Sequence, residues 1–173
     1  MRSVYVGVGS NIAPEQQVPI AVAALADRFE GVTASPVYRS RAVGFDGEDF
    51  LNLVVTFDSE ASPGDLARII DEIERDCGRE RGGERFAPRR IDLDLLLVGN
   101  HVSASGERPE LPRGEILRYA FVLRPLAELA PDLVHPVEGR PMATIWRQRQ
   151  PEIDGGDLRR VDLRWPEGVQ IAE

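Results

Sequence analysis

The chain of 173 residues is 42% hydrophobic and carries a formal net charge of −8, with an isoelectric point of about 4.9. This length and apolar content fit one domain with its own core, and the acidic charge argues against a nucleic-acid partner, because nucleic-acid-binding surfaces are dominated by clustered positive charge. No apolar run approaches the roughly 18 residues of a membrane span, and the N-terminus lacks a signal-peptide pattern, so we expect a cytoplasmic protein with no membrane partner.

The first third of the chain predicts a strand, a helix and an extended segment. Residues 3–8 have the pattern of a strand that ends in the turn Gly7-Val8-Gly9-Ser10-Asn11. This turn lacks the third glycine of a dinucleotide-binding fingerprint, so an ordinary strand-to-helix connection is the favoured interpretation. Apolar residues at helical spacing follow as far as Gly31. Residues 32–40 have an extended pattern, and residues 41–49 form a long loop of a kind that often carries binding contacts.

Residues 50–57 alternate between the two faces of a predicted strand. One face is apolar, and the other carries Phe50 and Asn52 together. An aromatic ring can stack on a flat heterocycle, while a neighbouring amide can bond the heterocycle's edge with one donor and one acceptor. For an isolated Phe-x-Asn, a strand face packed beneath a helix is the more common interpretation.

A helix is predicted to begin at Ser62-Pro63-Gly64-Asp65, which is a capping signature with proline at the first helical position. Apolar residues follow at helical spacing over residues 66–77, and Gly78 is a stop signal. Glu74 lies one turn beyond Ile70, where its side chain faces either solvent or a site.

The apolar strand predicted over residues 91–98 carries two carboxylates, Asp92 and Asp94. Because successive side chains of a strand point to opposite faces, the two carboxylates share one face, with Cα atoms about 6.8 Å apart. Such a pair suits magnesium, which prefers oxygen ligands. An amphipathic strand with a solvated face has the same pattern, and it is the more common interpretation of this stretch alone. The other face of the strand is predicted to hold Ile91, Leu93, Leu95 and Leu97.

The segment before this strand concentrates positive charge in an acidic chain. All 21 basic residues are arginines, which excludes a Walker-type phosphate lysine and a Schiff base. Guanidinium groups bind phosphate in a bidentate manner. Arginines beside a carboxylate pair therefore indicate a polyphosphate substrate together with a metal ion. Six of these arginines are Arg75, Arg79, Arg81, Arg85, Arg89 and Arg90.

The second half of the chain is predicted to contain more loop than the first. Gly99-Asn100 is a turn from which a short hairpin through residues 101–103 is predicted, and residues 105–115 form a loop. Residues 116–129 have a helical pattern that Pro125 is expected to interrupt.

The domain organisation predicted from these elements is simple. Residues 142–150 predict a last short helix, which completes a single domain over residues 1–150. The remaining residues, 151–173, are expected to form a polar and loosely ordered tail.

Five short motifs occur in this chain in the order and spacing that one enzyme family shows. The Pro88-Arg89-x-x-Asp92-Leu93-Asp94 segment is specific, and the other motifs are weaker singly but strong together. From about residue 2 to about residue 148, the chain resembles 6-hydroxymethyl-7,8-dihydropterin pyrophosphokinase. The motifs are Gly9-Ser10-Asn11, Phe50-Leu51-Asn52, Gly78-Arg79-x-Arg81, Ala87-Pro88-Arg89-x-Ile91-Asp92-Leu93-Asp94-Leu95 and Phe121-Val122-Leu123-x-Pro125-Leu126.

The resemblance implies an α+β fold, a ferredoxin-like antiparallel sheet of four to six strands flanked by helices, with an active-site cleft edged by three loops. It also implies the reaction. The hydroxymethyl oxygen of the substrate attacks the β-phosphorus of MgATP, diphosphate moves to the pterin and AMP is released, in the route to folate. The expected partners are these small molecules, and the protein is expected to be a monomer.

The resemblance further implies residues for catalysis, metal binding and nucleotide binding. Asp92 and Asp94 would hold two magnesium ions and, with Arg79 and Arg89, form the catalytic set. These roles agree with the polyphosphate and metal site indicated above by the arginines and the carboxylate pair, because phosphoryl transfer is achieved mainly by positioning and charge neutralisation. The nucleotide site or its closing loop would be lined by Glu74, Arg79, Arg81, Phe86, Arg89, Arg108, Arg113 and Arg118.

The implied pterin pocket uses a second set of residues. Phe50 and Phe121 would sandwich the pterin ring, and Asn52 would hydrogen-bond its edge. Main-chain groups near Ser40 and Val43 would complete the pocket.

Two positions depart from the family pattern. Where the family has a histidine after the proline of the segment before its last helix, this chain has Arg113. Where the family then has a phosphate-binding arginine six residues on, this chain has Tyr119, next to Arg118. Arg113 and Arg118 are candidates to restore the positive charge. The alternatives are weaker nucleotide binding or turnover, or a different pteridine substrate.

Three hypotheses are consistent with these residues. The chain is a pterin pyrophosphokinase, a catalytically weakened relative that binds pterin or nucleotide, or a ferredoxin-like interaction module without a ligand. A cleft that gathers Phe50, Asn52, Asp92 and Phe121 would argue against the interaction module.

Overall fold

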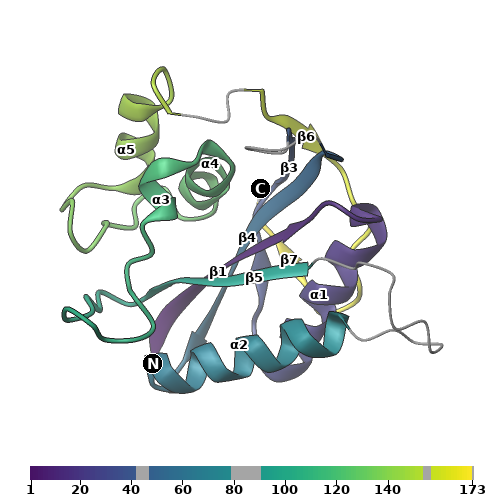
Figure 1. Ribbon diagram of the computed structural model, residues 1–173, viewed down its shortest axis with the longest axis horizontal. Helices are drawn as coiled ribbons and strands as arrows, with labels where there is room; N and C mark the ends of the chain where they lie inside the picture. The colour runs from purple at the N-terminus through teal and green to yellow at the C-terminus, as the bar shows by residue number, and fades with distance from the viewer. Residues whose placement is uncertain (42–46, 79–90, 154–156, 173) are drawn as a thin grey trace.

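The computed structural model describes residues 1–41, 47–78, 91–153 and 157–172. These residues form one seven-stranded sheet with helices on both of its faces (Figure 1). The sheet flanked by helices is as expected, but the strands number more than the expected four to six, and the β2–β7 pair is parallel rather than antiparallel. Among them, every helix is too short or too polar to cross a membrane. The strands are β1 (Arg2–Ser10), β2 (Thr33–Ala34), β3 (Val37–Ser40), β4 (Phe50–Ser59), β5 (Ile91–Val98), β6 (Arg159–Val161) and β7 (Gln170–Ile171). The helices are α1 (Pro14–Arg28), α2 (Pro63–Gly78), α3 (Glu115–Arg118), α4 (Ala120–Leu129) and α5 (Met142–Arg149).

Strand β1 lies between β4 and β5 and pairs antiparallel with both. Both β2 and β3 pair antiparallel with β4. The extended segment predicted over residues 32–40 is therefore confirmed, with an interruption at Ser35-Pro36. This arrangement places the motif-bearing strands β1, β4 and β5 side by side.

One face of these three strands is covered by α1 and α2, which lie below and to the right of the sheet in Figure 1. The ring of Phe29, just beyond α1, stacks on that of Phe57 with centroids 3.9 Å apart. The predicted start of α2 is confirmed, because the Ser62 hydroxyl accepts a hydrogen bond from Asp65 N at 3.1 Å. We call this side of the sheet the packed face, and its strand residues are Val4, Val6, Val8, Leu51, Leu53, Val55, Phe57, Ile91, Leu93 and Leu95.

The opposite side, which we call the cleft face, is covered by helices over part of its length. Here Tyr5 and Val54 pack with residues of α4 and α5, which lie above and to the left of the sheet in Figure 1. Farther along the same strands, the residues of this face line a cavity instead. They are Gly7, Gly9, Phe50, Asn52, Asp92 and Asp94.

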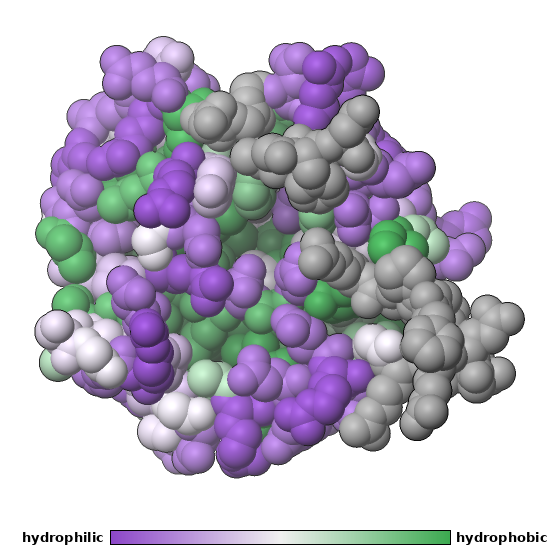
Figure 2. Space-filling view, in the orientation of Figure 1, coloured by the Kyte–Doolittle hydropathy of each residue, from purple (hydrophilic) through white to green (hydrophobic). Residues whose placement is uncertain are grey.

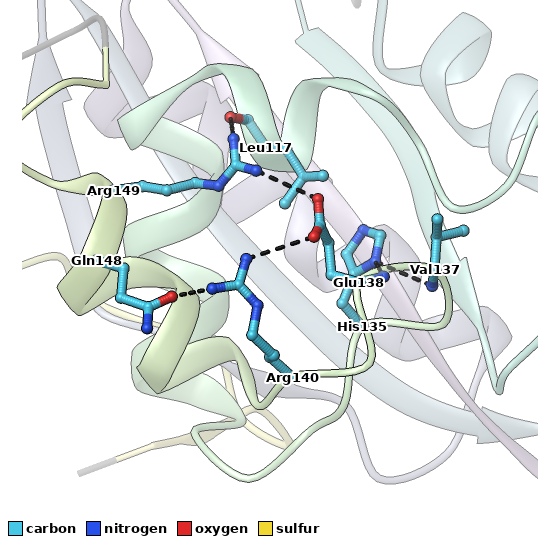
Figure 3. A network of polar contacts seen from close by, with 7 residues as sticks. All are labelled: Leu117, His135, Val137, Glu138, Arg140, Gln148 and Arg149. Carbon is cyan, nitrogen blue, oxygen red and sulfur yellow. Dashed lines mark hydrogen bonds and ion pairs between the residues drawn. The ribbon is translucent and has the colours of Figure 1, made fainter.

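A polar network fastens α5 to the segment before it (Figure 3). The Glu138 carboxylate accepts hydrogen bonds from Arg140 at 3.4 Å and from Arg149 at 3.2 Å. Arg149 also donates to the main-chain oxygen of Leu117 at 3.3 Å, which links α5 to α3. His135 is buried, and its Nδ1 accepts from the main-chain nitrogens of Val137 and Glu138 at 3.2 and 3.1 Å.

Two predictions for single elements were wrong. Leu97 lies on the cleft face rather than with Leu93, because the β1–β5 pairing shifts register between Tyr5 and Val6 and the alternation of side chains is reset there. The helical pattern of residues 116–129 is interrupted at Tyr119, whose backbone is extended, whereas Pro125 lies within α4.

Two further segments also differ from the prediction. Residues 101–103 follow the expected turn but form no strand, and Ser103 N instead donates to the Leu111 carbonyl at 2.8 Å. The tail is not loosely ordered over the part that the structure describes, because β6 pairs antiparallel with β3 and β7 pairs parallel with β2. These edge strands have only two or three residues each and a polar composition, so they carry no clear periodicity.

Candidate active site

The largest gathering of predicted site residues lines a cavity of about 300 Å³ on the cleft face, which we call the central cleft. Strands β1, β4 and β5 form its floor, and the start of α4 forms a wall. Figure 2, in the orientation of Figure 1, shows hydrophobic surface in the hollowed middle of the molecule, surrounded by hydrophilic residues. The predicted residues in its lining are Ser40, Phe50, Asn52, Asp92, Asp94 and Phe121.

The floor of the central cleft depends on a glycine in β1. A Cβ atom at Gly9 would lie 2.7 Å from Asn52 Oδ1, which is closer than the two atoms can approach. The Asn52 amide occupies that space and donates from Nδ2 to the Ser40 hydroxyl at 3.2 Å. Ser40 is buried, and the structure thus brings two of the predicted pterin-pocket residues into direct contact.

Aromatic residues from two elements line the central cleft. Phe50 comes from β4, and Phe121 comes from the first turn of α4. The ring of Tyr119 is nearly parallel to that of Phe121, with centroids 5.0 Å apart and an interplanar angle of 12°. Tyr119 also lines the central cleft, so it extends the aromatic surface of Phe121.

The carboxylates of β5 point into the central cleft, as the alternation of the strand predicts. Asp92 is exposed and Asp94 is half-buried. Burial raises the pKa of the Asp94 carboxyl, the Arg113 guanidinium opposes that rise, and the charges of Glu115 and Asp92 add to it. A cation at this place would favour the ionised form of Asp94.

The donor set fits a magnesium ion. Magnesium is usually bound by one or two carboxylates and completes its shell with water and substrate phosphates. Asp92 and Asp94 supply two carboxylates in an open cleft. No group of three or more acidic, histidine or cysteine side chains is gathered as a closed metal site among the residues that the structure describes.

A second cavity of about 580 Å³, the edge cavity, lies between α2 and the outer edge of β5. Asp94 and Arg113 line it, together with Glu74 and Arg108 from the predicted nucleotide set. Of the two alternatives for Glu74, solvent or a site, the structure shows that its side chain lines this cavity. Its Oε2 accepts from Leu93 N at 2.8 Å. Burial raises the pKa of Glu74, the Leu93 hydrogen bond opposes the rise, and nearby Asp92 and Asp94 add to it.

Arg113 lies between the carboxylates of Asp94 and Glu115. Its Nη2 is 3.4 Å from Asp94 Oδ1, and its Nε donates to Glu115 Oε2. Burial lowers the pKa of Arg113, but the hydrogen bond to Glu115 and the charge of Asp94 outweigh burial and raise it, so the guanidinium is a permanent cation. Arg118 lines neither the central cleft nor the edge cavity but a third one of about 390 Å³, the rim cavity, with Arg108 and Arg113.

Five predicted site residues lie outside the described residues. The predictions for Val43, Arg79, Arg81, Phe86 and Arg89 therefore stay predictions.

Sequence reasoning missed several residues of the lining. Gly7 and Gly9 repeat with a period of two, which indicates that one face of β1 carries no side chain at these positions. Tyr119 and Glu115 have no comparable signal, because their place depends on the break between α3 and α4. Arg75, one of the six arginines of the basic segment before β5, lines the edge cavity, and so does Arg68, which sequence reasoning did not single out.

Solved structures first identify the class of fold. A structure titled Plasmodium falciparum HPPK-DHPS wild type matches 92% of this chain with a TM-score of 0.67 and 10% identity, and the match covers 48% of that longer chain. The wild type with pteroate matches 87% of this chain with a TM-score of 0.66, covering 42% of that chain. At this identity the likeness shows the fold alone.

Sequence comparisons identify the family. The model of the 7,8-dihydro-6-hydroxymethylpterin-pyrophosphokinase (HPPK) family matches residues 5–131. Curated relatives named 2-amino-4-hydroxy-6-hydroxymethyldihydropteridine pyrophosphokinase include that of Pseudomonas aeruginosa, which is 40% identical over 81% of this chain and 87% of its own length. That of Synechocystis is 38% identical over 83% of this chain and 74% of its own length. That of Methylorubrum extorquens is 36% identical over 94% of this chain and its full length. The chain belongs to the 7,8-dihydro-6-hydroxymethylpterin-pyrophosphokinase family.

Proposed function

We propose that this protein transfers diphosphate from ATP to the hydroxymethyl group of 6-hydroxymethyl-7,8-dihydropterin and releases AMP, as a step of folate biosynthesis. The substrate oxygen forms a bond to the β-phosphorus of ATP. The bond from this phosphorus to the oxygen it shares with the α-phosphorus breaks, and that oxygen leaves on AMP with the electron pair. The alcohol proton is released to Asp94 or water.

The observation that carries the proposal is the composition of the central cleft. Two phenylalanines, Phe50 and Phe121, line one cavity with an amide, Asn52, and with the carboxylates Asp92 and Asp94. An aromatic slot with an amide suits a bicyclic amine, and a carboxylate pair suits metal-bound phosphate. This gathering argues against a ligand-free interaction module.

The edge cavity supports a place for the nucleotide next to the pterin. It shares Asp94 with the central cleft and is lined by Arg108 and Arg113, whose guanidinium groups can hold phosphate oxygens. We assign Glu74, and Arg118 on the neighbouring rim, to the same nucleotide region. Because the two cavities meet at Asp94, the hydroxymethyl group and the β-phosphorus can be brought together there, which is the main requirement of phosphoryl transfer.

Asp92 and Asp94 are the residues that would hold two magnesium ions. Bound there, magnesium neutralises phosphate charge and draws electron density from the phosphorus. The proposal also includes a ferredoxin-like arrangement with a cleft edged by three loops, a monomeric state and a cytoplasmic location, each of which is an expectation from the family resemblance or the composition.

A product assay tests the proposal. The protein is incubated with ATP, magnesium and 6-hydroxymethyl-7,8-dihydropterin, and the nucleotides are separated by chromatography. We expect AMP to form in equal amount with the pterin diphosphate. Formation of ADP would refute the reaction type, and measurable pterin binding without turnover under saturating magnesium would favour the catalytically weakened relative.

A further inference from the structure

Three charged side chains stand where the three cavities meet. Asp94 lines the central cleft and the edge cavity, Arg113 lines the edge cavity and the rim cavity, and Glu115 lines the rim cavity and the central cleft. Each of these residues is therefore shared by a different pair of cavities. A group that moves from the edge cavity to the central cleft must pass beside them.

The Arg113 side chain is held firmly at one end and loosely at the other. Its Nε donates to the Glu115 carboxylate, whereas its Nη2 is 3.4 Å from Asp94 Oδ1, which is longer than an ordinary charge-assisted hydrogen bond. Its main-chain nitrogen donates to the Leu96 carbonyl at 3.0 Å, which fixes the start of the side chain beside β5. The Nη groups are the part of Arg113 that is free to change partner.

We propose that Glu115 is a positioning residue that holds Arg113 Nε, so that the two Nη groups of Arg113 bind the diphosphate while it is transferred from ATP to the pterin. This inference rests on the proposed function. During transfer, the Nη groups exchange the Asp94 carboxylate for phosphate oxygens, as the β-phosphorus gains its bond to the hydroxymethyl oxygen and loses its bond to the oxygen of AMP. A planar guanidinium fixed at one nitrogen loses less rotational freedom when it binds phosphate with the other two.

The geometry also leaves most N–H donors of Arg113 available although Glu115 is bonded to it. One carboxylate occupies Nε, and the remaining four N–H donors belong to the Nη groups on the side facing Asp94. The Arg113 and Glu115 side chains are 38% and 36% exposed, so a phosphate can reach the guanidinium without unfolding the segment.

A double-mutant cycle on turnover tests the coupling. We expect Arg113→Ala to lower kcat about 100-fold, because it removes a cation from the transferred group, and Glu115→Ala to lower it about 10-fold, because it leaves that cation less well positioned. The double variant should be no slower than Arg113→Ala, since Glu115 acts only through Arg113. Glu115→Gln keeps an oxygen that accepts from Nε and should retain most activity.

Glu107→Ala is the matched control. Glu107 is an acidic residue of the same loop region, but its carboxylate accepts from Ala104 N and contacts His101 rather than an arginine. This variant should leave kcat unchanged.

Calorimetric binding of α,β-methylene-ATP, which cannot be cleaved at the reacting bond, gives a readout that does not need turnover. We expect Glu115→Ala to weaken binding in the parent protein and to have no effect in the Arg113→Ala background. Equal effects of Glu115→Ala in both backgrounds, on kcat or on analogue binding, would overturn the positioning role. A parent protein that forms no AMP would instead overturn the proposed function, so the two failures are distinct.

Discussion

The two faces of the same three strands differ in what their side chains do. On the packed face, ten residues of β1, β4 and β5 are buried, each at most 5% exposed. On the cleft face, the part that lines the central cleft carries two glycines, Phe50, Asn52 and two carboxylates, and the Asp94 side chain is 44% exposed. Because side chains alternate along a strand, neighbouring residues of one segment serve stability and chemistry separately. Substitutions on the two faces should therefore change different measured quantities.

Substitution of Phe57 on the packed face and of Phe121 in the central cleft should show the largest difference between the two faces. Phe57→Ala removes a buried ring that stacks on Phe29, and we expect unfolding to cost about 3–5 kcal/mol less in urea titrations. Phe121→Ala removes a half-buried ring of the central cleft, and we expect the KM for the pterin to rise about 10-fold through lost stacking. The comparison fails if Phe121→Ala costs as much stability as Phe57→Ala while the KM stays constant.

Gly9 offers a finer test on the cleft face. In Gly9→Ala the new methyl group would collide with the Asn52 amide, so that Asn52 must turn away from its place beside Ser40. We expect the KM for the pterin to rise about 10-fold, the equivalent of one lost hydrogen bond. Gly64→Ala is the control, because a Cβ there meets no atom within 4 Å. An unchanged KM in Gly9→Ala would contradict the role of Asn52.

His135, in the turn between α4 and α5, should make the stability of the fold depend on pH. Burial and the charge of Arg149 lower the pKa of His135, although Glu138 opposes them. The unfolded chain therefore binds a proton more readily than the folded one, and stability should fall as the pH drops below about 6.5. Denaturant titrations between pH 7.5 and 5 measure this slope.

His135→Asn is the matched variant for that slope, because the Asn Oδ1 atom replaces Nδ1 as acceptor for Val137 N and Glu138 N and does not titrate. The pH dependence of stability should be smaller in His135→Asn than in the parent protein. An identical slope in the two proteins would assign the effect to other groups.

The smallest predicted effect concerns the entry to α1. Ala13 has φ 42° and ψ 49°, a left-handed conformation that costs a residue with a Cβ more than it costs glycine. Ala13→Gly should therefore stabilise the fold by about 1 kcal/mol in thermal or urea unfolding. Ala26→Gly, inside α1, should instead destabilise it by about 1 kcal/mol. Destabilisation of both variants would show that the conformation of Ala13 carries no strain.

Local patterns predicted the elements that carry most of the site. The period of two in β4 and β5 placed Asn52, Asp92 and Asp94 correctly, and the cap at Ser62 fixed the start of α2. These features depend on neighbouring residues in the chain, so the sequence contains them directly.

Features that depend on distant partners were not predictable in the same way. The flip of Leu97 comes from a register shift against β1, and the order of the tail comes from pairing with β2 and β3. The contact of Arg113 with Asp94 and Glu115 requires β5 and α3 to be brought together by the loop between them. Sequence spacing gives no distance between such groups.

The most direct test of the account uses two adjacent residues of β5, Leu93 and Asp94. Turnover to AMP and unfolding free energy are measured for Leu93→Ala and for Asp94→Ala. We predict that Leu93→Ala loses about 2–5 kcal/mol of stability but keeps turnover at low temperature. We predict that Asp94→Ala loses about 1,000-fold or more in kcat with little change in stability. If Asp94→Ala still formed AMP at the parent rate, the assignment of the chemistry to the cleft face would be wrong.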